Sequence, residues 1–254
     1  MENNAQLIAQ CTEKAQQWLT PAFDEATRKE VEALIASEDK TNLIECFYKD
    51  LEFGTGGLRG IMGAGSNRMN IYTVGMATQG FANYLKLNFK DKEQISVVVC
   101  HDCRNNSRLF AENVAAIFSA NGIKVYLFDD MRPTPECSFA IRHLGCQAGV
   151  NITASHNPKE YNGYKVYWAD GAQLPPQHAA AIAARLEQID IFTGVKRMAF
   201  DDAVKAGLIT LLGEETDKMF MSNVMAMIND RASVAQVADS FKVVYTPFHG
   251  CGWK

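Results

Sequence analysis

The sequence predicts an α/β fold, a three-layer α/β/α domain built on a mixed, mostly parallel sheet. Between residues 95 and 152, short apolar runs alternate with amphipathic segments of helical length. A segment with helical periodicity comes before this region, and the last residues resemble the start of a second, similar domain. The hydrophobic content, 47% of 254 residues, is sufficient for a buried core.

The first fifty residues are predicted to be helical, because apolar side chains recur every three or four positions between charged ones. Pro21 interrupts the pattern, so at least two helices are expected. After Phe53 the composition changes to a glycine-rich segment, Gly54–Gly65, which indicates backbone brought close to other groups. A further helix is expected from Ile71 to about Asn88.

Three apolar runs are predicted to form parallel strands: Ile95–Cys100, Ile123–Phe128 and Gln147–Ile152. The helices between them are expected at Ser107–Ala120, with a capping serine, and at Thr134–Leu144, after Pro133. Right-handed crossovers lead us to expect both helices on one face of the sheet. The loops that carry function should lie at the carboxyl ends of the strands.

Beyond the third strand, Asn162–Gly163 is expected to be a turn into a returning strand, Tyr164–Trp168. Helices are expected from Pro175 to about Ile189 and over Glu214–Ile228, followed by a strand at Phe241–Thr246. Because such a strand ordinarily leads into a helix, we expect the chain to stop soon after a second domain has begun. The exposed edge of that strand predicts self-association.

Net charge, apolar runs and cysteine spacing limit the partners, the compartment and the cysteine chemistry that we expect. The net charge is −4 and the cations are scattered, so no nucleic acid partner is expected. No run approaches the ~18 apolar residues of a membrane span and no leader pattern opens the sequence, which predicts a cytoplasmic protein. The seven cysteines lack a disulfide-framework spacing and are expected to be reduced. Cys100 and Cys103 fit a redox pair or half a zinc site, but a structural role is favoured because no second pair follows.

Ser155 follows a buried strand in the segment Thr153–Pro158, so its hydroxyl can be exposed as a nucleophile, with His156 beside it. Taken alone, an ordinary loop serine is the simpler interpretation. Phosphoryl transfer needs mainly positioning and neutralisation of negative charge. Arg59, Arg104, Lys165 and His156 are the candidate cations.

Two of these cations have an alternative role. Arg104 can pair with Asp102 as a structural clamp, and Lys165 can be a solvated surface residue rather than a group that moves a proton. The sequence has no Asp-x-Asp-x-Asp cluster, His-x-x-x-His pair or Walker loop. Any metal would therefore be incompletely ligated by this chain.

Four motifs, in this order along the chain, resemble the α-D-phosphohexomutase family, which includes phosphoglucomutases and phosphomannomutases: Phe53–Gly60, Asp102-x-Arg104 with Ser107, Thr153–Pro158 and Asn162–Lys165. The resemblance runs from about residue 40 to the end of the chain. The helical extension and residues 60–70 are most similar to the branch with long amino termini, the phosphoglucomutases and phosphopentomutases. The resemblance implies a helical extension over residues 1–50, a first family domain with a phosphoserine loop over 51–205, and a truncated second domain over 206–254.

The resemblance also implies a mechanism, that of an intramolecular phosphotransferase of the isomerase class. Phosphorylated Ser155 would give its phosphoryl group to a hexose monophosphate, and a bisphosphorylated sugar would return its other phosphoryl group. Hexose 1-phosphate and hexose 6-phosphate are thereby interconverted. By position, Arg59 and Lys165 match residues of the family that are implicated in charge stabilisation and proton transfer. His156 matches the histidine beside the phosphoserine. The expected phosphate-binding residues are Thr55, Gly56, Gly57, Arg59, Arg104 and Asn157.

The implied cofactor is Mg²⁺, with phosphorylated Ser155 as one ligand and three aspartates of a second domain as the others. A sugar bisphosphate is implied as activator. Those aspartates and the later sugar and phosphate loops are missing from this chain, so we expect it to be an inactive amino-terminal fragment of an active enzyme. A non-catalytic sugar-phosphate-binding module is the alternative. A serine hydrolase built on Ser155 and His156 is a third hypothesis, weakened by the lack of a Gly-x-Ser-x-Gly elbow.

Overall fold

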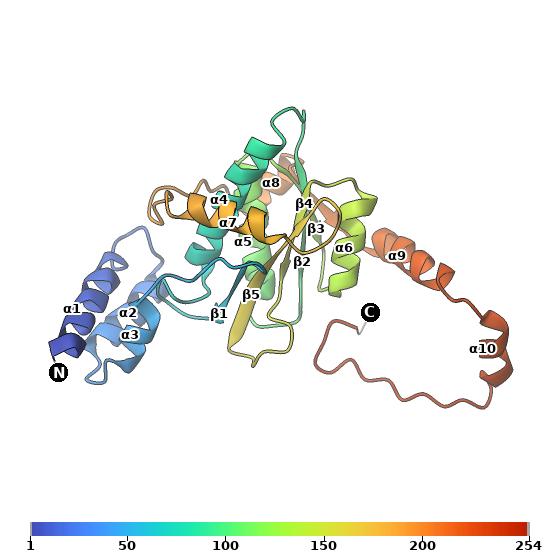
Figure 1. The fold of residues 1–254 in the computed structure, drawn as a ribbon, viewed down its shortest axis with the longest axis horizontal. Coiled ribbons are helices and arrows are strands. Elements are labelled where there is room, and N and C mark those ends of the chain that lie inside the picture. Colours follow the sequence, from blue (N-terminus) through green and yellow to red (C-terminus); the bar gives the residue numbers. More distant parts are fainter. Residues whose placement is uncertain (1, 253–254) are drawn as a thin grey trace.

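The computed structural model of the protein describes residues 2–252 (Figure 1). Its helical extension consists of α1 (Glu2–Gln17), α2 (Glu25–Ala36) and α3 (Thr41–Phe47). Pro21 lies between the first two helices, as predicted. The extension has its own apolar cluster, in which Trp18 stacks on Phe23 and meets the edge of Tyr72 from the following domain. Within residues 2–252, no helix combines the length and apolarity needed to cross a membrane.

The domain is built on a six-stranded sheet of order β1-β5-β4-β2-β3-β6. The strands are β1 (Leu58–Ile61), β2 (Ser96–His101), β3 (Lys124–Phe128), β4 (Ala148–Ile152), β5 (Tyr161–Trp168) and β6 (Ile209–Leu212). The β2–β3, β2–β4 and β3–β6 pairs are parallel, whereas β5 is antiparallel to both of its neighbours. The predicted α/β class with a mixed, mostly parallel sheet is confirmed. Strand β6, which is only four residues long, was not predicted.

Helices cover both faces of the sheet (Figure 1). One face carries α4 (Ile71–Asn88), α5 (Ser107–Ala120), α7 (Pro176–Leu186) and α8 (Phe200–Lys205). The other carries α6 (Thr134–His143), against which α9 (Glu214–Ala226) packs. The last described helix is α10 (Arg231–Val237). The bounds of α4 and α5 agree with the sequence prediction.

The prediction that α5 and α6 share a face of the sheet is wrong. Val97 and Val99 of β2 face the apolar cluster that includes α5, whereas Val98 and Cys100 face the cluster that includes α6. The reason is strand order: β3 lies on one side of β2 and β4 on the other. The two right-handed crossovers therefore run in opposite directions, and their helices cover opposite faces.

Two local predictions also need correction. Ser107 does not cap α5: Asn106 is the N-cap, and the buried Ser107 hydroxyl donates instead to the Asp102 carboxylate, at 2.7 Å. Asn162 and Gly163 do not form a turn but lie inside β5, where Gly163 pairs with Arg59. Gly163 is needed for close approach, because a Cβ there would lie 2.5 Å from the Thr153 carbonyl oxygen.

The predicted strand at Phe241–Thr246 is wrong as well. The segment has no regular structure, and the Val244 side chain is 97% exposed. A strand needs a neighbour to accept its backbone hydrogen bonds, and no described strand lies beside this segment. The predicted self-association through its edge therefore loses its structural basis. The predicted boundary between a first and a second domain, at residues 205 and 206, stays a prediction. Strand β6 follows this boundary in the sequence but belongs to the same sheet as the other strands. Residues 253–254 of the predicted second domain lie outside the described residues.

Candidate active site

Three loops meet at the carboxyl ends of β2, β3 and β4. The parallel pairing of these strands places their ends at one edge of the sheet, as predicted. Backbone hydrogen bonds connect the loops: the Asp102 N–H donates to the Ile152 carbonyl at 3.0 Å, and the Arg132 N–H donates to the His101 carbonyl at 3.2 Å. The edge is thus a continuous, hydrogen-bonded surface.

Ser155 lies at the exposed part of the loop that follows β4. Its φ of 59° is in the left-handed region, which is unfavourable for a non-glycine residue by about 1–2 kcal/mol. The Ser155 N–H donates to Oγ1 of Thr153 at 3.0 Å, which helps to hold this conformation. The side chain is exposed, with Oγ 3.4 Å from Nδ1 of His156. The hydroxyl is therefore open to a reaction partner from outside.

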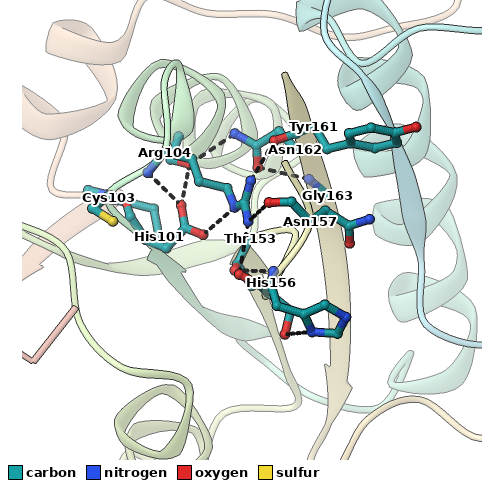
Figure 2. A network of polar contacts seen from close by, with 12 residues as sticks. His101, Cys103, Arg104, Thr153, His156, Asn157, Tyr161, Asn162 and Gly163 are labelled. Atoms are coloured by element: carbon teal, nitrogen blue, oxygen red, sulfur yellow. Dashed lines mark hydrogen bonds and ion pairs between the residues drawn. The ribbon is translucent and has the colours of Figure 1, made fainter. Parts of the chain in front are cut away.

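The Arg104 guanidinium binds the backbone of the serine loop, which follows β4. Its Nη1 donates to the carbonyl oxygens of Pro158 at 2.8 Å and Tyr161 at 3.1 Å. Its Nη2 donates to those of Ser155 at 2.9 Å and Asn157 at 2.6 Å. Figure 2 shows the Arg104 guanidinium surrounded by the loop, with the His156 ring directed away from it. One side chain thus fixes the path of the backbone on both sides of the serine.

Asp102 in turn holds Arg104. Its Oδ2 lies 3.2 Å from Arg104 Nε, and its Oδ1 accepts hydrogen bonds from the Arg104 N–H and the Ser107 hydroxyl. Asn162 of β5 donates to that hydroxyl at 2.9 Å. These contacts agree with the interpretation of Arg104 as a structural clamp. Its predicted phosphate-binding role stays a prediction, since the guanidinium is occupied by backbone carbonyls.

Arg59 and Lys165 lie on the same face of the sheet. Arg59 is opposite Gly163 across the β1–β5 pair, and Lys165, two residues further along β5, projects to the same side. Burial lowers the pKa of Lys165, nearby Arg59 lowers it further, and Asp102 opposes the shift. Lys165 releases its proton more easily than a solvated lysine, which suits a group that exchanges a proton with a hydroxyl.

The glycine-rich segment before β1 makes a tight hairpin. Gly54 and Gly57 exchange two backbone hydrogen bonds of 2.9 Å, which leaves Thr55 and Gly56 exposed at the tip. Gly57 has a φ of 94°, and a Cβ at this position would overlap the carbonyl oxygen of Tyr164 in β5. The hairpin is therefore packed directly against the strand that carries Lys165.

Thr153, Asn162 and His101 also contribute to this site, although none of them was predicted as a site residue. His101 is 4% exposed, and its Nδ1 lies 2.9 Å from the Asp102 carbonyl oxygen. Burial lowers its pKa, which favours the neutral ring. The spacing Asp102-x-Arg104 with Ser107 was the available signal for this network, but it does not reveal which loop the arginine holds.

The described residues do not by themselves complete a magnesium site. Among residues 2–252, no three His, Cys, Asp or Glu side chains are placed to hold one ion together. Ser155 would provide a ligand only after phosphorylation, and the nearby Asp102 carboxylate already binds Arg104 and Ser107. The expected aspartate ligands stay a prediction.

A cavity of about 610 Å³ lies apart from this edge. It is bounded by the helical extension, the glycine-rich hairpin region, α4 and the end of α7, with Trp18, Phe53 and Met76 among its lining residues. None of the predicted site residues lines it. The cavity therefore does not coincide with the candidate active site.

Comparison with protein families decides the assignment. The model described as "Phosphoglucomutase/phosphomannomutase, alpha/beta/alpha domain I" matches residues 50–191, more than half of the chain. The chain belongs to the phosphoglucomutase/phosphomannomutase family. The resemblance stated from the four motifs is thereby confirmed.

Individual relatives of this chain carry the names of phosphomutases. A probable phosphoribomutase of Schizosaccharomyces pombe is 39% identical over 246 residues, 94% of this chain and 40% of the relative. The phosphopentomutase of Homo sapiens is 44% identical over 186 residues, 71% of this chain and 30% of the relative. The chain thus spans about a third of the length of such relatives.

A solved structure agrees with this assignment. The crystal structure of a putative phosphomannomutase from Thermus thermophilus superposes with a TM-score of 0.50 at 30% identity, covering 62% of this chain and 36% of that one. The matched region is only a part of that protein.

Proposed function

We propose that this chain forms the phosphoryl-carrying part of a phosphosugar mutase that interconverts hexose 1-phosphate and hexose 6-phosphate. The observation that carries the proposal is Ser155, exposed at the edge of the sheet on a loop that Arg104 fixes through four backbone carbonyls. A rigidly positioned, solvent-accessible hydroxyl is what a phosphoryl carrier requires. The names of its relatives support a phosphomutase, and they make pentose phosphates the substrates to test against hexose phosphates.

In the proposed reaction, a hydroxyl of the sugar monophosphate attacks the phosphorus atom on Ser155. The new O–P bond forms as the Ser155 O–P bond breaks, and a bisphosphorylated sugar results. Lys165 in its neutral form takes the proton of the attacking hydroxyl, the departing Ser155 oxygen takes up a proton from solvent, and the Arg59 cation stabilises the charge on the transferred group. In the return step the Ser155 hydroxyl releases its proton to solvent as it takes the other phosphoryl group, and Lys165 gives its proton to the departing sugar oxygen.

We assign substrate phosphate binding to the hairpin tip at Thr55 and Gly56, together with Gly57, Arg59 and Asn157. The exposed position of the tip supports this role. His156 is proposed to act beside the phosphoserine. Arg104 is proposed to act mainly through the loop, because its donors are bound to carbonyls, and its predicted contact with the substrate phosphate stays a prediction.

When bound, Mg²⁺ would help to neutralise the phosphoryl group. We propose phosphorylated Ser155 as the one ligand from the described residues, a sugar bisphosphate as activator and a cytoplasmic location. No step is assigned to the ion, because the remaining ligands are not among the described residues. We further propose that the chain by itself does not turn over hexose phosphate. A sugar-phosphate-binding module is the competing function for the chain alone, and it is supported by the incomplete metal ligation.

The test compares the 254-residue chain with the full-length product of its gene, whatever the length of that product. Both are incubated with glucose 1,6-bisphosphate and Mg²⁺, and the peptide that contains Ser155 is analysed by mass spectrometry, with Ser155→Ala as control. Turnover of glucose 1-phosphate and of ribose 1-phosphate is then compared. Phosphate on Ser155 and turnover by the full-length protein alone are expected. Full-length protein that binds phosphosugar but never carries phosphate on Ser155 would establish the binding module.

A further inference from the structure

Two of the seven cysteines differ from the others in accessibility. Cys11, Cys46, Cys100, Cys137 and Cys146 are buried. Cys103 is exposed, and Cys251 is partly exposed. All seven lie within the described residues. The two accessible thiols are therefore the ones that a small oxidant can reach.

These two cysteines, far apart in the sequence, lie together in the structure. The Cys103 thiol donates to the carbonyl oxygen of His249, with 3.4 Å between the heavy atoms. Cys251 lies two residues beyond His249 in the sequence. The Cys103 thiol thus contacts the segment that carries Cys251. Figure 1 shows that the chain after α10 turns back toward the sheet.

We propose that Cys103 and Cys251 form a reversible disulfide that fastens residues 247–252 to the active-site loop. Cys103 is adjacent to Asp102, which holds the Arg104 clamp, so the bond would join the terminal segment directly to the support of the serine loop. The proposal concerns oxidation of the protein and does not depend on the proposed mutase activity.

The oxidant is a low-molecular-weight disulfide such as glutathione disulfide. The Cys103 thiolate attacks one sulfur of the oxidant, which forms a mixed disulfide and releases one glutathione thiolate. Cys251 then loses its proton, and its sulfur attacks the Cys103 sulfur and expels the second glutathione thiolate. The two cysteine thiols are oxidised by two electrons in total, and one glutathione disulfide is reduced to two thiols.

The order of the steps follows from the surroundings of each thiol. Burial, with a smaller contribution from Asp102, raises the pKa of Cys251 to about 12, while the hydrogen bond from Cys103 opposes this shift. Cys251 therefore reacts second, and closure should become faster as the pH rises, since the thiolate is the attacking species.

The nearby Cys100 is not expected to compete. It is completely buried, and burial together with its contact with Cys137 holds its pKa well above the usual range. We therefore expect no redox pairing between Cys100 and Cys103, and the structural role favoured from the sequence stays a prediction.

The experiment treats the purified 254-residue chain with glutathione disulfide, blocks remaining thiols by alkylation and maps disulfide-linked peptides by mass spectrometry. We expect a Cys103–Cys251 linkage that forms faster at a pH of about 9 than at about 7 and is removed by dithiothreitol. The linkage should disappear in Cys103→Ser and Cys251→Ser and remain in Cys146→Ser, with circular dichroism to verify that each variant is folded.

Three outcomes would overturn the proposal in a folded protein. These are a linkage between Cys100 and Cys103, a mixed disulfide on Cys103 that never closes, and complete absence of oxidation at Cys251. Because none of these measurements uses a phosphosugar, failure here leaves the proposed function unaffected.

Discussion

The guanidinium of Arg104 donates to the carbonyl oxygen of Ser155 at 2.9 Å, although the two residues follow different strands. The bond connects the loop after β2 with the loop after β4 and supports a left-handed residue that would otherwise be unfavourable. The position of the proposed nucleophile is thus determined by a residue that does not have to contact the substrate.

Replacement of Arg104 by lysine should loosen the serine loop. One ammonium group cannot reproduce the fork of donors that binds four carbonyls, so we expect the free energy of unfolding to fall by about 2 kcal/mol. Chemical denaturation measures this change, and Lys159→Ala, on the exposed surface of the same loop, is the control. Equal stability of Arg104→Lys and the wild type would contradict the clamp.

Gly57→Ala should be strongly destabilising, because the added methyl group would overlap the Tyr164 carbonyl and the residue requires a φ of 94°. A loss of about 3 kcal/mol is expected. Gly54→Ala, at the other end of the same hairpin, has open space around its Cβ and should be tolerated. Thermal unfolding of the two variants gives the comparison, and similar melting temperatures would show that the hairpin is not packed as described.

The pKa of Lys165 should respond in opposite directions to its two charged neighbours. Arg59→Ala removes a positive charge and should raise it, whereas Asp102→Asn removes a negative charge and should lower it further. NMR titration of isotopically labelled, dimethylated lysines provides the measurement, with Lys165→Arg to assign the signal. Shifts of the same sign in both variants would exclude the electrostatic explanation.

Glu136 should make stability depend on pH. Burial and the neighbouring Asp217 carboxylate raise its pKa from 4.5 to about 7, while Arg132 opposes this. Between these two values the folded state binds more protons than the unfolded chain, so the free energy of unfolding should fall as pH rises from about 4.5 to about 7.

Glu136→Gln should remove this part of the pH dependence, since glutamine does not titrate in that range. Urea denaturation at a series of pH values measures it, and Glu160→Gln, an exposed residue, is the control. If Glu136→Gln retained the wild-type slope, another group would have to be responsible.

The sequence by itself determined the local elements and the chemically important loops. Helices α4 and α5 were located close to their observed bounds, because their hydrophobic periodicity is a local signal. The exposed serine loop was located by a buried strand followed by small and polar residues. Family motifs then identified Ser155, Arg59 and Lys165 as a group, and their proposed roles stay predictions.

Only the tertiary structure decided which groups meet. Strand order placed α6 on the opposite face from α5, turned Gly163 from an expected turn residue into a strand residue, and gave Ser107 a carboxylate partner. The tertiary structure also decided which carbonyls Arg104 binds and brought the His249 carbonyl to the Cys103 thiol. These relationships join segments far apart in the chain, and a local pattern records the preference of each residue but not the partner that folding brings beside it.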